Sequence, residues 1–138
     1  MDRKFAISVV SLFFLSMGLG FIVHELLLGD DYARLPLLFR PKEQMGSYFP
    51  FMLLAHALIA AGFVWIYRQG REEKPFFAQG VRFGVAVAVL MTIPIYLIYY
   101  AVQPMPGMMV AKQIAFDTVG VVLMGIAVAW MYRSAGEG

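Results

Sequence analysis

Apolar residues follow one another in long runs along this chain, rather than in the narrow stripe of a helix that covers a soluble core. Four such runs extend over about residues 5–28, 48–67, 81–102 and 109–132. A helix of about 20 apolar residues crosses the roughly 30 Å hydrocarbon core of a bilayer. The pattern therefore predicts an all-α fold, a four-helix transmembrane bundle of two antiparallel hairpins that forms a single membrane domain over residues 1–138.

Short polar segments join the four runs. The longest, residues 29–47, mixes apolar residues such as Tyr32 and Phe39 with charges and contains Pro41. This mixture is typical of a short helix that lies along the membrane interface. The segment before the third run is charged and contains Pro75, and residues 103–108 contain a tight Pro-Met-Pro-Gly turn. Neither is long enough to form a domain of its own.

The composition excludes several classes of protein. With 61% hydrophobic and 14% charged residues, the chain has too little polar material to cover a soluble globule, which excludes a soluble enzyme, a nucleic-acid binder and a disordered chain. The chain contains no cysteine, so a disulfide framework and a cysteine-bound metal cluster are also excluded. Four short helices bury little surface, and we therefore expect the bilayer and either further copies of the chain or a larger membrane complex as partners.

The basic residues predict the orientation. If both termini are cytoplasmic, seven of the eleven lysines and arginines lie on the inner side, as the positive-inside rule requires. The second run ends in Trp-Ile-Tyr-Arg at residues 65–68, and the fourth ends in Trp-Met-Tyr-Arg at residues 130–133. Such endings are typical of aromatic rings at headgroup depth followed by an arginine in water. The inner basic residues are Arg3, Lys4, Arg68, Arg71, Lys74, Arg82 and Arg133.

Polar side chains within the runs gather in the predicted outer half. Ser16, Gly20 and His24 follow each other at four-residue spacing on the first helix, and such residues share one helix face. Ionisable groups within a membrane are costly and usually face the bundle interior. We therefore expect a polar pocket that binds a ligand in the outer half. Its candidate residues are His24, Glu25, His56, Tyr96, Tyr99, Gln113 and Asp117.

Three interpretations of these residues stay open. His24 and His56 could bind haem b or a transition metal ion, because neutral imidazoles are common metal ligands. Asp117 needs a partner, which is either Lys112, at an unfavourable five-residue spacing, or a group on another helix such as His56. A pair of Asp117 and His56 could carry protons, and such a pair would suit a small carrier of protons or a solute. Alternatively, the histidines could form hydrogen bonds that fix the helix register.

Four segments of the chain resemble small uncharacterised bacterial four-helix integral membrane proteins. They are residues 20–24 (Gly-Phe-Ile-Val-His), residues 28–32 (Leu-Gly-Asp-Asp-Tyr), Arg40-Pro41 and Ala55-His56. The resemblance implies a compact helical bundle in the bacterial cytoplasmic membrane, and it implies no activity or substrate. Together with the absence of a catalytic motif, it favours a non-enzymatic accessory or ligand-binding component.

Overall fold

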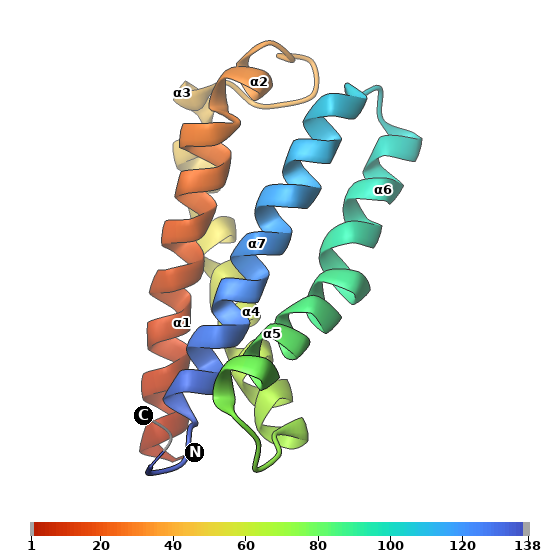
Figure 1. Cartoon of the computed structure of the whole chain (residues 1–138). Coiled ribbons are helices and arrows are strands. Elements are labelled where there is room, and N and C mark those ends of the chain that lie inside the picture. The colour runs from red at the N-terminus through yellow and green to blue at the C-terminus, as the bar shows by residue number, and fades with distance from the viewer. Residues whose placement is uncertain (1, 137–138) are drawn as a thin grey trace.

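The protein is a bundle of long helices whose two termini lie at the same end (Figure 1). The computed structural model describes residues 2–136. We call the end that carries the termini the termini end, and the opposite end, which α2 crosses, the α2 end. The helices are α1 (Arg3–Phe21), α2 (Gly29–Ala33), α3 (Lys42–Met45), α4 (Phe49–Gly70), α5 (Phe76–Val87), α6 (Ile93–Val102) and α7 (Gly107–Met131).

The predicted all-α architecture is confirmed. Within the described residues, four continuous helical stretches are long and apolar enough to cross a membrane, namely Arg3–Leu27, Lys42–Gly70, Phe76–Val102 and Gly107–Met131. The third stretch begins earlier than the predicted residue 81. Pro75 lies directly before its first residue, where the missing N–H of proline breaks no helical hydrogen bond, so the helix begins as soon as the charged loop ends.

Two of the four stretches contain a π-helical turn that the sequence pattern did not predict. One covers Ile22–Leu27 at the end of α1, and the other covers Ala88–Thr92 between α5 and α6. The second ends two residues before Pro94, which has no N–H to donate and whose ring crowds the carbonyl four residues earlier, within the π turn. The wider turn therefore accommodates Pro94 within a continuous span. The first π turn contains His24, and such turns are frequent at functional sites.

The termini end is packed through glycines. A Cβ added to Gly84 would lie 2.5 Å from Val122 Cα, and one added to Gly125 would lie 2.3 Å from Gly80 O. The backbones of α5 and α7 are therefore in direct contact, as small residues allow in membrane bundles. Around this contact lies the main core of buried side chains: Leu12, Ala60, Phe63, Val64, Tyr67, Met124, Val128, Ala129 and Tyr132.

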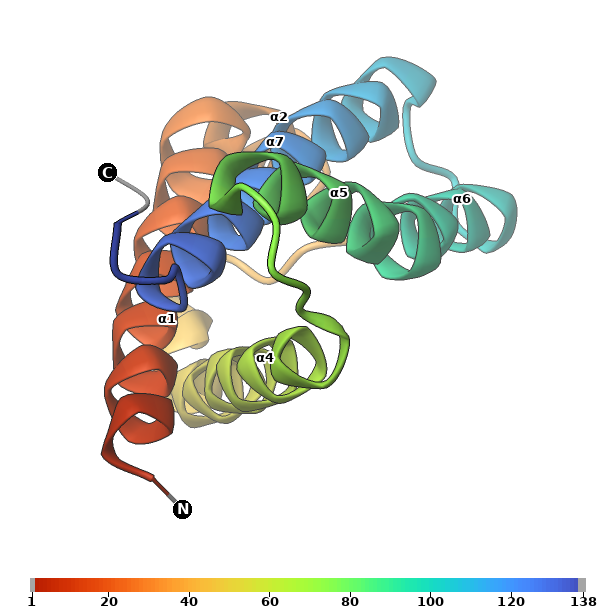
Figure 2. The same ribbon diagram turned by 60° about the horizontal axis from the view of Figure 1, so that its bottom comes forward.

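The α2 end is more open. The long segment between α1 and α4 crosses it (Figure 1). Tyr32 and Phe39 of this segment pack on a small buried cluster of Met105, Met109 and Val110. Seen from the termini end, α4 lies to one side of α5 and α7, and its main contact is with α1 (Figure 2). The outer surface of α4 is consequently exposed and apolar.

Candidate functional site

A chain of hydrogen bonds between side chains connects four helical segments near the α2 end. Tyr96 on α6 donates to Asp117 Oδ2 on α7, and His24 Nε2 lies 3.3 Å from the same oxygen. His24 Nδ1 lies 2.6 Å from the hydroxyl of Tyr32 on α2. Gln113, on α7, donates from Nε2 to that hydroxyl at 3.2 Å. We call these five residues the polar cluster.

The acceptors in the polar cluster determine where the protons lie. A carboxylate can only accept, so a hydrogen bond between Asp117 and His24 would place a proton on His24 Nε2. The oxygen of Tyr32 accepts from Gln113, which leaves its own O–H free to donate to His24 Nδ1. In this pattern both ring nitrogens of His24 face a partner, Tyr32 on one side and Asp117 on the other.

The side-chain amide of Gln113 donates through its nitrogen, but its oxygen has no partner among the described residues. Its side chain is only 4% exposed, and its Oε1 is buried with no hydrogen bond among the described residues. A buried polar atom without a partner costs free energy, and such atoms are rare in folded proteins. The polar cluster therefore lacks one hydrogen-bond donor.

Tyr32 closes the polar cluster from the side of α2. Its ring lies nearly parallel to the imidazole of His24, with ring centroids 5.9 Å apart, and packs against Phe39 at 4.5 Å. Burial raises the pKa of Tyr32 to about 12. The hydrogen bond from Gln113 acts to lower this pKa, whereas the nearby charges of Asp117 and Asp31 act, like burial, to raise it. The phenol therefore stays protonated and remains a donor at neutral pH.

An ion pair links α2 to α7 above the polar cluster. Lys112 Nζ lies 3.1 Å from Asp31 Oδ2, and the two side chains are 41% and 26% exposed. Asp31 precedes Tyr32 in the chain, and Lys112 precedes Gln113. The ion pair and the Tyr32–Gln113 hydrogen bond therefore connect the same two segments side by side, and together they hold α2 over the end of α7.

His56 is not part of the polar cluster. Its Nδ1 lies 2.9 Å from Ser16 Oγ on α1, and Ser16 donates its own proton to the carbonyl of Phe13 at 3.0 Å. His56 Nδ1 must therefore be the donor to Ser16. The ring also packs on Gly20, where an added Cβ would lie 3.4 Å from Cε1. The expected pairing of Asp117 with His56 is wrong, because the carboxylate lies against His24.

Two more candidate residues lie outside the polar cluster. Glu25 forms an ion pair with Lys42 at 2.9 Å, because the π turn directs it towards the segment before α4. Tyr99 is 47% exposed, and the hydrogen bonds found within residues 2–136 do not connect it to the polar cluster. Tyr96, one turn earlier on α6, is the tyrosine that faces Asp117. The structure thus brings together His24, Tyr96, Gln113 and Asp117.

The two histidines are differently placed for a metal or haem. Both ring nitrogens of His24 have a partner, so a metal ion bound there would have to displace Asp117 or Tyr32. His56 keeps Nε2 available. Within residues 2–136 no group of three histidine, cysteine, aspartate or glutamate side chains is placed to hold a metal ion.

Sequence reasoning missed Tyr32, which had been attributed to the membrane interface. A tyrosine next to a helix end and among charges is typical of an interfacial ring, so the pattern favoured that interpretation. The signal that could have identified it is its position just after the first span and eight residues beyond His24, where a returning segment can cover the histidine.

In the comparisons with known proteins, no family model, curated protein or solved structure matches the chain.

Proposed function

We propose that this protein is a small, non-enzymatic integral membrane protein whose polar cluster binds a small molecule that donates hydrogen bonds. The observation that carries the proposal is the buried Gln113 Oε1, which has no donor among the described residues and lies on the same helix as the carboxylate of Asp117. An uncompensated acceptor and a carboxylate together favour an amine that donates hydrogen bonds over an anion or an apolar ligand.

The proposed location is the bacterial cytoplasmic membrane, with both termini cytoplasmic and the α2 end on the outer side. Four apolar helical stretches support a membrane location, and the resemblance described above supports the bacterial one. The orientation is supported by the gathering of Lys4, Arg68 and Arg71 at the termini end, since basic residues favour the cytoplasmic side.

The partners that we propose are lipid and either a second copy of the chain or a larger membrane complex. The surface of α4 that faces away from α1 supports this, because Phe51, Leu54 and Leu58 are 69%, 58% and 64% exposed. Apolar surface of this kind needs a hydrocarbon environment, which lipid tails or another helix supply. An accessory subunit that presents its polar cluster at the outer side of a complex fits this arrangement.

Thermal unfolding of the purified protein in detergent tests the ligand class. Methylammonium chloride is compared with tetramethylammonium chloride at equal ionic strength, because the second cation has no N–H to donate. At about ten times its dissociation constant, a ligand that binds the folded state adds roughly 1.4 kcal/mol of stability. We therefore expect methylammonium to raise the midpoint by several degrees, and tetramethylammonium to have no such effect.

Variants show whether the effect belongs to the polar cluster. Gln113→Leu keeps the size of the side chain and removes the free acceptor, so it should abolish the difference between the two salts. Glu25→Gln, which changes an acidic residue that pairs outside the polar cluster with Lys42, should retain it. If the two salts act alike on the unaltered protein, the polar cluster only fixes the helix register.

The same preparation distinguishes a cofactor protein from a ligand-binding one. An absorption spectrum with elemental analysis is recorded for the unaltered protein and for His24→Ala and His56→Ala. A haem band, or a stoichiometric metal, that disappears in both variants would overturn the proposal in favour of a redox or metal-binding protein. A colourless and metal-free preparation keeps the polar cluster as a ligand site.

A further inference from the structure

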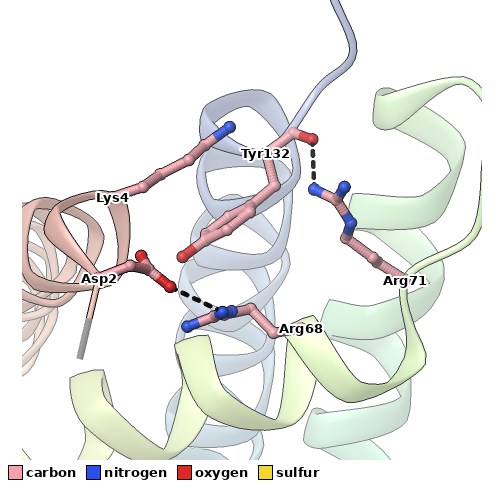
Figure 3. Close-up of a pocket in the computed structure, with 5 residues that line it drawn as sticks. All are labelled: Asp2, Lys4, Arg68, Arg71 and Tyr132. Carbon is pink, nitrogen blue, oxygen red and sulfur yellow. Dashed lines mark hydrogen bonds and ion pairs between the residues drawn. The ribbon is translucent and has the colours of Figure 1, made fainter.

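A cavity of about 410 Å³ lies at the termini end, far along the bundle from the polar cluster. It is lined by residues of α1 and α4 and of the segments that precede α1 and follow α4 and α7: Asp2, Lys4, Arg68, Arg71 and Tyr132 (Figure 3). The three basic residues come from α1, α4 and the segment that follows α4. The cavity is therefore formed by the folding of the whole bundle rather than by one loop.

Tyr132 forms the floor of this cavity and has a hydroxyl without a partner. The residue is 8% exposed, and its hydroxyl is buried without a hydrogen bond among the described residues. Figure 3 shows the hydroxyl directed into the space between Asp2 and Arg68. The ring of Tyr132 therefore faces the bundle and not its outer surface, whereas Trp130, two residues earlier, is 53% exposed.

Three cations surround the ring of Tyr132. Lys4 Nζ lies 4.9 Å from the ring centroid, and the guanidinium carbons of Arg71 and Arg68 lie 5.7 and 6.0 Å from it. Like charges held this close repel each other, and a site of this kind attracts an anion. Lys4 forms none of the ion pairs found within residues 2–136, and its ammonium is therefore available to a ligand.

One carboxylate compensates part of this charge. Asp2 lies 2.8 Å from Arg68, and it also caps α1 by accepting the backbone N–H of Phe5 at 2.7 Å. The hydrogen bond from Phe5 and, to a smaller extent, the charge of Arg68 lower the pKa of Asp2, so it is an anion at neutral pH. Arg71 donates to the carbonyl of Tyr132 at 3.0 Å. Three cations and one anion leave the cavity positive.

We propose that this cavity binds the phosphate group of an acidic phospholipid. A phosphate offers several strong acceptors, and the free donors of the cavity, which are the Lys4 ammonium, the remaining guanidinium N–H groups and the Tyr132 hydroxyl, match them. The proposal is independent of the ligand of the polar cluster. It needs only the placement of the four apolar stretches in a bilayer.

The position of the cavity favours a lipid over a soluble phosphate. Three of the apolar stretches begin or end beside it, at Arg3, Gly70 and Met131. Trp65 and Trp130, at the same end, are 58% and 53% exposed, and exposed tryptophans are enriched at headgroup depth. The phosphate of a lipid whose chains lie along α1 and α4 would reach the cavity, since it lies at the boundary of the hydrocarbon.

The test is native mass spectrometry of the full chain in detergent, titrated with phosphatidylglycerol or with phosphatidylcholine of the same acyl chains. We expect phosphatidylglycerol to bind about tenfold more tightly, because near-surface cations favour anionic headgroups. Equal binding of the two lipids would overturn the proposal. Inorganic phosphate is titrated separately, and if it binds as tightly as phosphatidylglycerol, a soluble phosphate is the ligand and the lipid assignment is wrong.

Two variants and a control locate the binding. Lys4→Gln should weaken phosphatidylglycerol binding about fivefold, as expected for one cation near a headgroup. Arg133→Gln removes the same charge at the same end, but Arg133 stacks on Trp130 outside the cavity, so its effect should be less than twofold. If both variants lose the same affinity for phosphatidylglycerol, the lipid responds to the overall positive charge of this end of the bundle, and the cavity is not the site.

Tyr132→Phe separates binding from folding. The variant removes a hydroxyl that has no hydrogen bond, so the stability of the lipid-free protein should not fall. Phosphatidylglycerol affinity should fall about tenfold, because a hydrogen bond to a charged group is lost. An unchanged affinity in Tyr132→Phe would exclude the hydroxyl from the site and overturn its assignment as a ligand-binding group.

Discussion

The half of the bundle at the termini end is held by contact between backbones, whereas the half at the α2 end is held by hydrogen bonds between side chains. Gly80, Gly84 and Gly125 bring α5 and α7 together without intervening side chains. At the other end, Asp117 reaches α6 and α1 through Tyr96 and His24. Helices in backbone contact leave no room for an added atom. Helices joined by hydrogen bonds between side chains lie further apart, because the side chains fill the space between them.

This difference locates the chemistry. The termini half is closely packed around Leu12, Val64 and Val128, which are fully buried, and its charged groups gather at its end, around the cavity. The polar cluster lies in the looser half, where His24 keeps 37% of its side chain exposed. The glycine contact is therefore the fixed base of the bundle, and the polar cluster lies in the half that depends on contacts between side chains.

The largest expected effect comes from an atom added to the glycine contact. Gly84→Ala would place Cβ 2.5 Å from Val122 Cα and 2.9 Å from Val121 O, and backbone atoms cannot move aside as a flexible side chain can. We expect a loss of about 3 kcal/mol in the free energy of unfolding, measured by denaturation in mixed micelles.

The matched control for this variant is Gly62→Ala on α4, where an added Cβ meets nothing within 4 Å. It should stabilise the protein by roughly 0.5–1 kcal/mol, because alanine is a better helix former than glycine. Equal destabilisation by both variants would show that the loss comes from the helix backbone and not from contact between α5 and α7.

The next effect is a loss of stability at high pH that depends on Tyr32. The phenol ionises near pH 10 when unfolded and near 12 when folded, so unfolding releases a proton between these values. The free energy of unfolding should fall by roughly 2–3 kcal/mol as the pH rises through this window. Tyr32→Phe should remove that part of the loss, measured by chemical denaturation at each pH.

Tyr48→Phe serves as its control, since Tyr48 is 45% exposed and lies outside the polar cluster. This variant should keep the alkaline loss of the unaltered protein. If Tyr32→Phe and Tyr48→Phe have the same pH profile, burial of Tyr32 against the polar cluster does not govern the alkaline stability.

Sequence reasoning succeeded where one pattern decides the outcome, and it failed where the path of the backbone decides. Twenty apolar residues in a row predict a span, whatever its neighbours. The partner of Asp117 depends on the π turn at residues 22–27, because a projection at 3.6 residues per turn does not describe the face that follows it. Likewise, Trp130 and Tyr132 lie about 200° apart on a helix of 3.6 residues per turn, and only the packing of α7 shows that Tyr132 is the buried one of the two.

Asp117→Asn is expected to have a smaller effect than the alkaline loss. The carboxylate accepts from Tyr96 and lies 3.3 Å from His24, and hydrogen bonds to a charged group each contribute about 1.5–3 kcal/mol. Since an asparagine oxygen still accepts one of them, we expect a net loss of about 2 kcal/mol. The measurement is denaturation in mixed micelles, combined with Tyr96→Phe in a double-mutant cycle.

Glu25→Gln is the control for Asp117→Asn, because its ion pair with Lys42 is exposed and such pairs contribute less than about 1 kcal/mol. A coupling energy near zero between Asp117 and Tyr96 would mean that the hydrogen bond between them does not hold α6 against α7. The α2 half would then be stabilised by its apolar contacts alone.

The smallest expected effect tests how α2 is held over the polar cluster. Lys112 and Asp31 are 3.1 Å apart but partly exposed, and a pair of this kind contributes about 0.5 kcal/mol. Lys112→Met should therefore barely change global stability, but it removes one of the two polar links found between α2 and α7 within residues 2–136. The remaining link is the Tyr32–Gln113 hydrogen bond, and amide hydrogen exchange in α2 should accelerate while exchange in α5 stays unchanged. Faster exchange in both helices would mean that the two halves open together, and that the contrast between them does not extend to their dynamics.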